Sequence, residues 1–142
     1  MNKSHLTAIT RKGPSLPMRR LDGDGLLVGR VLDYGCGRGD DMVAFDIEGY
    51  DPYYWPDSPT GTFNTITCNY VLNVLRYKKE RQAVLDIIRS KLTPRGKAYI
   101  TVRNDRRNLN GRTSRGTWQC VVKLKYPVLY KTAGYVTYIL ER

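Results

Sequence analysis

The sequence predicts an α/β fold, and two stretches carry that prediction. In the first, residues 30–41, an apolar strand runs into a turn that contains Gly35, Gly37 and Gly39. Glycine permits backbone angles and close approaches that a Cβ would block, so we expect something to lie against the main chain there. In the second, residues 77–92, apolar side chains recur at spacings of three and four, which is typical of a helix with one buried face.

The N-terminal residues differ in character from the rest. Residues 1–20 carry five basic residues and no acid, and Pro14 and Pro17 interrupt regular structure. We predict an extended basic arm here, followed by a single domain over residues 21–142. A solvated, disordered terminus is the alternative, and His5, the only histidine, fits that alternative better than a catalytic role.

The other elements are predicted from local patterns. Apolar and β-branched runs indicate strands, and clusters of Pro, Gly, Ser and Asp indicate loops or turns. We expect strands at 31–32, 47–50, 62–69, 97–103, 117–126 and 135–140, a short helix at 40–45, a loop at 54–61, a turn at 93–96 and a long polar loop at 103–116.

The glycine turn has the spacing of a ligand-binding loop. Asp33 precedes a Gly-x-Gly-x-Gly run, whereas the dinucleotide pattern Gly-x-Gly-x-x-Gly is absent because Asp40 occupies its last position. The turn resembles the first motif of the class I methyltransferases that use S-adenosylmethionine (SAM). Acidic residues around the turn suit a cationic sulfonium better than a pyrophosphate. A structural glycine turn, or a loop for another nucleotide, is the alternative.

This resemblance implies a Rossmann-like class I methyltransferase sheet, mostly parallel, that ends in a C-terminal antiparallel hairpin. Residues 117–126 and 135–140 look like that hairpin. The usual fold has a helix, a strand and another helix after its second strand, but the loop at 54–61 is too short to hold them. We therefore expect a sheet trimmed after the second strand, with a more open adenine side. Either this side is covered by the aromatic residues Tyr53, Tyr54 and Trp55, or these residues pack on the sheet.

A second resemblance is more specific. The methyltransferases encoded beside DNA phosphorothioation genes have segments similar to residues 5–9, 11, 14–17, 21, 49–53 and 70–75. That resemblance extends over roughly residues 5–103 and points to the same cofactor.

Asp51, at the tip of the second strand, is the expected ribose contact because a carboxylate can accept hydrogen bonds from both hydroxyls. Residues 51–54 also resemble the Asp-Pro-Pro-Tyr motif of DNA amino-methyltransferases. In those enzymes the motif follows the fourth strand, so here we expect it to pack near the ribose and adenine. The predicted cofactor contacts are Asp33, Tyr34, Gly35, Cys36, Gly37, Gly39, Asp51, Pro52, Tyr53 and Asn69.

Asn69 and Tyr70 end the strand expected beside the first one, where ligands meet in open α/β sheets. A carbonyl of Asn69 can orient an attacking amine, and the ring of Tyr70 can stack on a base. These two residues are the predicted catalytic pair. Alternatively, or in addition, Asn69 caps the helical turn at 70–75.

The charge distribution predicts a polyanionic partner. The net charge is +11, but residues 22–57 carry −7 and the remainder carries +18. DNA or RNA is the simplest partner for such a surface, and a merely soluble basic surface is the alternative. The loop at 103–116 holds five arginines and one acid. The predicted substrate contacts are Arg11, Lys12, Arg103, Arg106, Arg107, Arg112 and Arg115.

Other classes of protein are less compatible with the composition. Cys36, Cys68 and Cys120 have neither metal-ligand nor disulfide spacing, so we expect no metal site and a reducing compartment such as the cytoplasm. No apolar run is long enough for a membrane span, and we expect no membrane partner. The oligomeric state is not predictable.

A base nitrogen is the expected methyl acceptor. Cytosine-carbon methylation uses a cysteine after proline, and no cysteine here follows proline. Ribose methylation commonly uses an aspartate where Asn69 stands. A nitrogen with an available lone pair needs no strong acid or base from the protein, which then supplies only proximity and orientation. One alternative is a non-catalytic nucleic-acid-binding module. The other is a small-molecule methyltransferase, because residues 70–75 also resemble the segment that such enzymes carry after the fourth strand.

Overall fold

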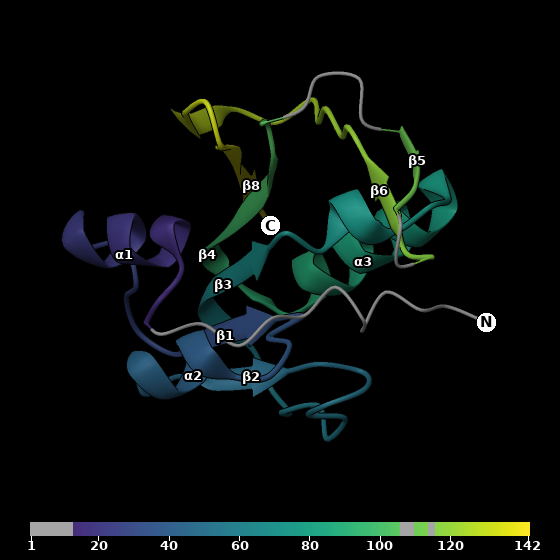
Figure 1. Cartoon of the computed structure of the whole chain (residues 1–142). Coiled ribbons are helices and arrows are strands. Elements are labelled where there is room, and N and C mark those ends of the chain that lie inside the picture. Colours follow the sequence, from purple (N-terminus) through teal and green to yellow (C-terminus); the bar gives the residue numbers. More distant parts are fainter. Residues whose placement is uncertain (1–12, 106–109, 114–115) are drawn as a thin grey trace.

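The fold is built on a six-stranded sheet in the order β2-β1-β3-β4-β8-β7, as a computed structural model shows (Figure 1). The structure describes residues 13–105, 110–113 and 116–142. Four neighbouring strands are parallel, and the last two are antiparallel. In chain order the strands are β1 (Val31–Tyr34), β2 (Glu48–Tyr50), β3 (Phe63–Asn69), β4 (Leu92–Arg103), β7 (Val128–Lys131) and β8 (Tyr135–Glu141). This confirms the predicted mostly parallel α/β sheet with an antiparallel end.

Helices lie on both faces of the sheet. The chain forms α1 (Leu16–Gly23), α2 (Asp40–Ala44) and α3 (Lys78–Ser90), with a short 3₁₀ helix, η2 (Leu72–Val74), after β3. In Figure 1, α1 and α2 lie to one side of the strands and α3 lies to the other. Each helix therefore covers part of one face, and the carboxyl ends of β1, β2, β3 and β4 remain together at one edge.

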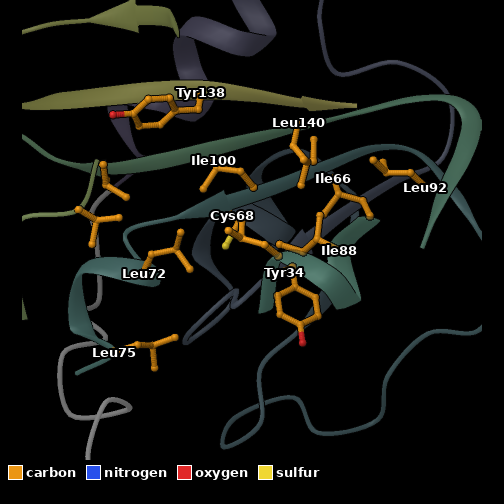
Figure 2. Close-up of a cluster of buried hydrophobic side chains, with 14 of the residues drawn as sticks. Tyr34, Ile66, Cys68, Leu72, Leu75, Ile88, Leu92, Ile100, Tyr138 and Leu140 are labelled. Carbon is orange, nitrogen blue, oxygen red and sulfur yellow. The ribbon is translucent and has the colours of Figure 1, made fainter. Parts of the chain in front are cut away.

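The sheet separates two apolar clusters because neighbouring residues of a strand point to opposite faces. Ile100 of β4 joins the cluster on the α3 face with Ile88 (Figure 2), whereas Tyr99 joins the cluster on the α1 face with Met18. All four side chains are buried. Packing on both faces holds the strand ends in fixed positions.

The predicted loss of the outer strand is confirmed. β2 is the edge of the sheet, and the chain between β2 and β3 contains only a turn closed by a bridge between Asp51 and Trp55. In this described segment there is no helix and no further strand. The ribose end of the expected cofactor site is therefore flanked by a turn instead of a strand and its helices.

The predicted extended conformation is wrong for the end of the N-terminal arm. Helix α1 begins at Leu16, and Met18 within it is completely buried. Pro17 stands in the first turn, where a backbone N–H has no intrahelical acceptor, so proline starts this helix instead of breaking it. Residues 1–12 lie outside the described residues, and the division at residue 20 stays a prediction.

The start of β4 also differs from expectation. The strand begins at Leu92, not after the predicted turn at 93–96. Phe63 pairs with Leu92, yet Thr65 pairs with Lys97, so the intervening residues of β4 form an irregularity within the strand. Pro94 lacks a backbone N–H and is compatible with such a bulge.

The C-terminal hairpin forms from a different pair of segments than predicted. β7 pairs with β8, whereas β6 (Trp118–Cys120) pairs with β5 (Asn110–Arg112) in a separate two-stranded sheet. β5 also lies within the predicted loop at 103–116. Apolar and polar residues alternate over 117–126, and the apolar side chains of Cys120 and Val122 are buried against the α3-side cluster. Alternation does not specify which strand is the partner.

Candidate functional site

The glycine turn between β1 and α2 requires its glycines. Gly35, Gly37 and Gly39 have φ values of 80°, 56° and 87°, in the left-handed region that side chains disfavour. The backbone N–H groups of Gly35 and Cys36 both donate to the carbonyl of Tyr50, at 2.7 and 2.9 Å. The turn thus folds back over the end of β2, which joins the first two strand ends.

The close approach at Gly35 comes from this chain itself. A Cβ on Gly35 would lie 2.4 Å from a methyl group of Val71, in the segment between β3 and η2. That distance is impossible for a real side chain, so glycine at 35 allows the segment after β3 to rest on the turn. The two segments on which the predicted site depends are therefore in contact.

Asp51 binds the turn from the end of β2. Its Oδ2 accepts a hydrogen bond from the N–H of Gly37 at 3.0 Å, and its Oδ1 accepts from Tyr53 and Tyr54 at 2.9 and 3.0 Å. The side chain is nearly buried. Because a carboxylate offers about four acceptor positions, roughly one is left for a ribose hydroxyl instead of the two that we expected.

The aromatic residues after Asp51 lie over the turn. Trp55 reaches Gly39, where a Cβ would meet its indole nitrogen at 2.9 Å, and Arg38 stacks over the ring of Tyr54 at 5.1 Å. Tyr53 is 61% exposed. Trp55 and Tyr54 therefore cover part of this side, which is one of the two arrangements that we expected. Tyr53 projects to the surface.

Asp33 is buried beneath the turn. Its Oδ1 accepts a hydrogen bond from the hydroxyl of Thr67 at 2.9 Å, and the two residues are paired in register between β1 and β3. Burial raises the pKa of the nearby Cys36 thiol to about 12, with a further contribution from the carboxylates of Asp33 and Asp51. Burial likewise raises the pKa of Tyr34 to about 12. Cys36 is thus a protonated thiol at neutral pH, not a nucleophile.

Asn69 presents a buried, unused amide at the end of β3. Among the described residues, neither its Nδ2 nor its Oδ1 has a hydrogen-bond partner, although both atoms are buried. The predicted capping role is wrong, because η2 has Val71 at its N-cap and no side-chain cap. A buried amide without partners is costly, and a water or a ligand that hydrogen-bonds to it would remove that cost.

Tyr70 follows in a strained conformation. Its φ is +61°, in the left-handed region, and its N–H donates to the carbonyl of Thr101 at 2.8 Å. Arg103 lies nearby: its guanidinium binds both carboxylate oxygens of Asp105 at 2.7 Å, which raises the pKa of Arg103, with a smaller contribution from Tyr70. The predicted catalytic pair and one predicted substrate contact therefore share this edge.

The other predicted substrate contacts are separated. Arg112 lies on β5, opposite Trp118 of β6. The remaining predicted contacts lie outside the described residues: Arg11, Lys12, Arg106, Arg107 and Arg115.

Sequence reasoning missed a second polar position near Asn69. Asn73, in η2, is 1% exposed; its Nδ2 donates to Oε1 of Gln119 at 3.0 Å, and its Oδ1 has no partner within the described structure. The indole nitrogen of Trp118 is also buried without a partner there. A polar residue within the apolar run at 70–75 was the available signal for Asn73.

Two negative findings apply to the described part of the chain. No group of three or more His, Cys, Asp or Glu side chains there could hold a metal ion. None of the helices there combines the length and apolar character that crossing a bilayer requires.

The comparison with protein families agrees with this geometry. The model described as "Methyltransferase domain" matches residues 10–129, which is most of the chain. The chain belongs to the methyltransferase domain family. No curated protein sequence matches this methyltransferase.

Solved structures of similar fold share little sequence. One, from work on the conversion of a disulfide bond into a thioacetal group during echinomycin biosynthesis, is 19% identical with a TM-score of 0.56. That match covers 68% of this chain and 54% of the other, so this chain spans about half the length of that protein. The DhpI-SAM-HEP complex is 11% identical, with a TM-score of 0.54 over 87% of this chain and 86% of that one.

A third similar structure is the glycopeptide N-methyltransferase MtfA complexed with sinefungin. It is 16% identical, with a TM-score of 0.50 over 72% of this chain and 59% of that one. At these identities the likeness concerns the fold.

Proposed function

We propose that this methyltransferase transfers a methyl group from SAM to a nitrogen of a nucleic-acid base. The observation that carries the proposal is the amide of Asn69, which is buried without a partner in the described structure, at the strand end that packs against the glycine turn through Val71. Support for the cofactor comes from the family and from a neighbour of similar fold that is named as a SAM complex.

The residues of the turn fit this cofactor. Asp33 and Asp51 give the site a negative character, which favours a cationic sulfonium. The one remaining acceptor position of Asp51 would bind a ribose hydroxyl, and the turn of Gly35 to Gly39 would lie beneath the nucleoside. Bound SAM supplies an electrophilic methyl group. The protein's part is to hold that ligand and the acceptor in line and to exclude water.

Asn69 would orient the acceptor. An amide offers one acceptor and two donors, so Oδ1 can accept from an amino or ring N–H while Nδ2 donates to an adjacent ring nitrogen or carbonyl. Such paired contacts match the edge of a base. The ring of Tyr70 would stack on that base. The nitrogen would attack the methyl carbon with its own lone pair as the methyl–sulfur bond breaks and S-adenosylhomocysteine leaves. An amino or ring N–H would then lose its proton to solvent, so no strong general base is required.

The charge of the chain supports a nucleic-acid substrate. Outside residues 22–57 the chain carries +18, and Arg103 lies at the same edge as Tyr70. Phosphates would be attracted to the basic part and repelled by the acidic part around the glycine turn. This polarity would direct a strand toward the acceptor side and away from the cofactor side.

A small-molecule acceptor is the second candidate, and one comparison favours it. A neighbour of similar fold is named as a glycopeptide N-methyltransferase. The buried amides of Asn69 and Asn73 would also suit a neutral, polar small molecule. A nucleic-acid-binding module without catalysis is the third possibility.

Transfer of tritiated methyl groups distinguishes these candidates. The protein is incubated with labelled SAM in three separate reactions, which contain total DNA, total RNA or a small-molecule extract. The methylated nucleosides are then identified by mass spectrometry. We expect label in a base nitrogen, and at least a tenfold lower rate for Asn69→Ala. No label in any DNA or RNA would reject the proposal, and label in the extract alone would select the small-molecule candidate.

Binding of S-adenosylhomocysteine by calorimetry completes the test. Salt-sensitive DNA binding without heat of cofactor binding, and without transfer to any acceptor, would select the non-catalytic module. Loss of binding in Asp51→Ala is expected, and because that change also removes three hydrogen bonds within the turn, Asp51→Asn is the milder variant to compare with it.

A further inference from the structure

A group of aromatic and basic side chains lies outside the site described above. Arg76 precedes α3, and its guanidinium stacks over two rings: that of Tyr77 at 5.3 Å and that of Trp118 at 4.8 Å. Tyr77 is 54% exposed, and Arg76 is exposed as well. Arg76 thus joins the exposed ring of Tyr77 to the partly buried ring of Trp118, and these cation–ring contacts preorganise the side chains.

The hairpin of β5 and β6 extends this surface. Arg112 is paired directly with Trp118, so their side chains lie on the same face of the two-stranded ribbon. Figure 1 shows β6 beside the start of the α3 region, and β6 packs against η2. Residues from two distant parts of the sequence therefore meet here. We call the following set the hairpin–helix surface: Arg76, Tyr77, Lys78, Lys79, Arg112 and Trp118.

The surface places positive charges at the positive end of the α3 helix dipole. Lys78 and Lys79 occupy the first two positions of α3, where the helix dipole is positive and cations are unfavourable. Glu80 is the only carboxylate among residues 76–85, and it accepts a hydrogen bond from the N–H of Tyr77 at 3.3 Å. The position favours an anionic partner, which would relieve this unfavourable placement.

We propose that the hairpin–helix surface binds a single-stranded nucleic-acid segment next to the acceptor base, which rests on the function proposed above. Exposed rings stack on unpaired bases, and neighbouring cations bind the phosphates of the same strand. A duplex hides the faces of its bases and cannot use the rings. We therefore expect the surface to distinguish single-stranded from double-stranded nucleic acid, and not one base sequence from another.

The surface is connected to the candidate site through a short segment. Val71 packs on Gly35, Asn73 follows in η2, and Arg76 comes three residues later. Asn73 also donates to Gln119, the neighbour of Trp118 in β6. These contacts run from the glycine turn through η2 to β6, and in this proposal a strand held on Arg76 and Tyr77 would place one of its bases at Asn69.

Fluorescence anisotropy with a labelled 12-nucleotide single strand tests the proposal at Tyr77. Tyr77→Ala removes the ring, and we expect affinity for the strand to fall by about tenfold. Tyr77→Phe keeps the stacking face and is expected to bind as the native protein does. Equal affinities for both variants and the native protein would overturn the proposal. A duplex of the same sequence is expected to bind more weakly than the single strand, and tighter duplex binding would also overturn it.

The charges are tested separately. Lys78→Gln/Lys79→Gln is expected to lower the salt dependence of binding by about 1.4 in log–log slope, since each single-strand phosphate contact contributes about 0.7. The matched control, Arg95→Gln/Lys97→Gln, removes two exposed cations at the opposite end of β4 and is expected to leave the slope unchanged. Equal effects of the two double variants would mean that only net charge matters, which would reject the surface.

The methyl-transfer assay keeps this inference distinct from the proposed function. If label enters nucleic acid while the Tyr77 and Lys78/Lys79 variants bind normally, the surface is wrong and the function stands. If strand binding depends on these residues but no nucleic acid is methylated, the surface stands and the function is wrong. Failure to bind any single strand rejects the surface.

Discussion

At the scale of single residues, Asn69 offers a test that separates stability from function. Its amide atoms are buried without partners in the described structure, so removing them relieves an unfavourable burial. We expect Asn69→Ala to change the free energy of unfolding by less than about 1 kcal/mol while it reduces methyl transfer. Urea denaturation measures the first quantity. A strongly destabilised variant would show that Asn69 is a structural residue.

Residue-level prediction succeeded where a motif specifies backbone conformation. The glycine turn was predicted because only glycine suits positions with positive φ. The hydrogen bonds that Asp51 accepts within the chain were not predictable, because those from Gly37 and Tyr54 depend on how the chain after β2 turns back. That Asn69 does not cap the following turn also required the structure, since a cap and a ligand contact both place a polar residue after a strand.

At the scale of elements, α1 is tied to α2 by one residue pair. The N–H of Ser15 donates to Oδ1 of Asp41 at 2.8 Å, and the Ser15 hydroxyl donates to Oδ2 at 2.7 Å. Both residues are buried. Hydrogen bonds to a buried carboxylate are among the stronger ones, so this pair fixes the start of α1 beside the glycine turn.

A double-mutant cycle measures that connection. We expect Ser15→Ala to lower the free energy of unfolding by about 1–3 kcal/mol, because the hydroxyl bond is lost and the Asp41 carboxylate stays buried. Asp41→Ala should cost at least as much, and the double variant less than the sum of the two. Additive losses in chemical denaturation would indicate that the two residues act independently.

Elements with a clear period were predictable and their partners were not. Residues 77–92 gave α3 because its apolar spacing is helical, and the structure has the helix at Lys78–Ser90. Residues 117–126 alternate, but the side chains that they bury face η2 and the α3-side cluster, not a neighbouring strand of the main sheet. Long-range strand pairing has no local signal.

At the scale of the whole molecule, alkaline pH should destabilise the fold. The pKa values of Cys36, Tyr34 and Tyr130 are each raised to about 12, mainly by burial. Their unfolded values are about 8.5 for cysteine and 10 for tyrosine. Because the native state holds these protons more tightly, their contribution to stability is complete below about pH 8.5 and is lost as pH rises toward 12.

Urea unfolding at pH 8, 9.5 and 11 measures this effect. We expect the denaturation midpoint to fall at each step. Cys36→Ala removes one of the three groups, so its decline between pH 8 and 9.5 should be smaller than that of the native chain. An unchanged midpoint up to pH 11 would contradict the proposed burial of these groups.

The overall architecture followed from length and from one resemblance. A loop of eight residues at 54–61 cannot hold a helix, a strand and a second helix, and the sheet does end at β2. The choice of acceptor could not follow in the same way, because one methyltransferase fold accommodates many substrates.

The carboxylate of Asp51 has a consequence for how a ligand arrives. Its three hydrogen bonds hold the glycine turn and the end of β2 together in the ligand-free chain. Little conformational entropy then remains to be lost at this position when a nucleoside enters. We therefore expect the proposed ribose contact at Asp51 to form without rearrangement of the glycine turn.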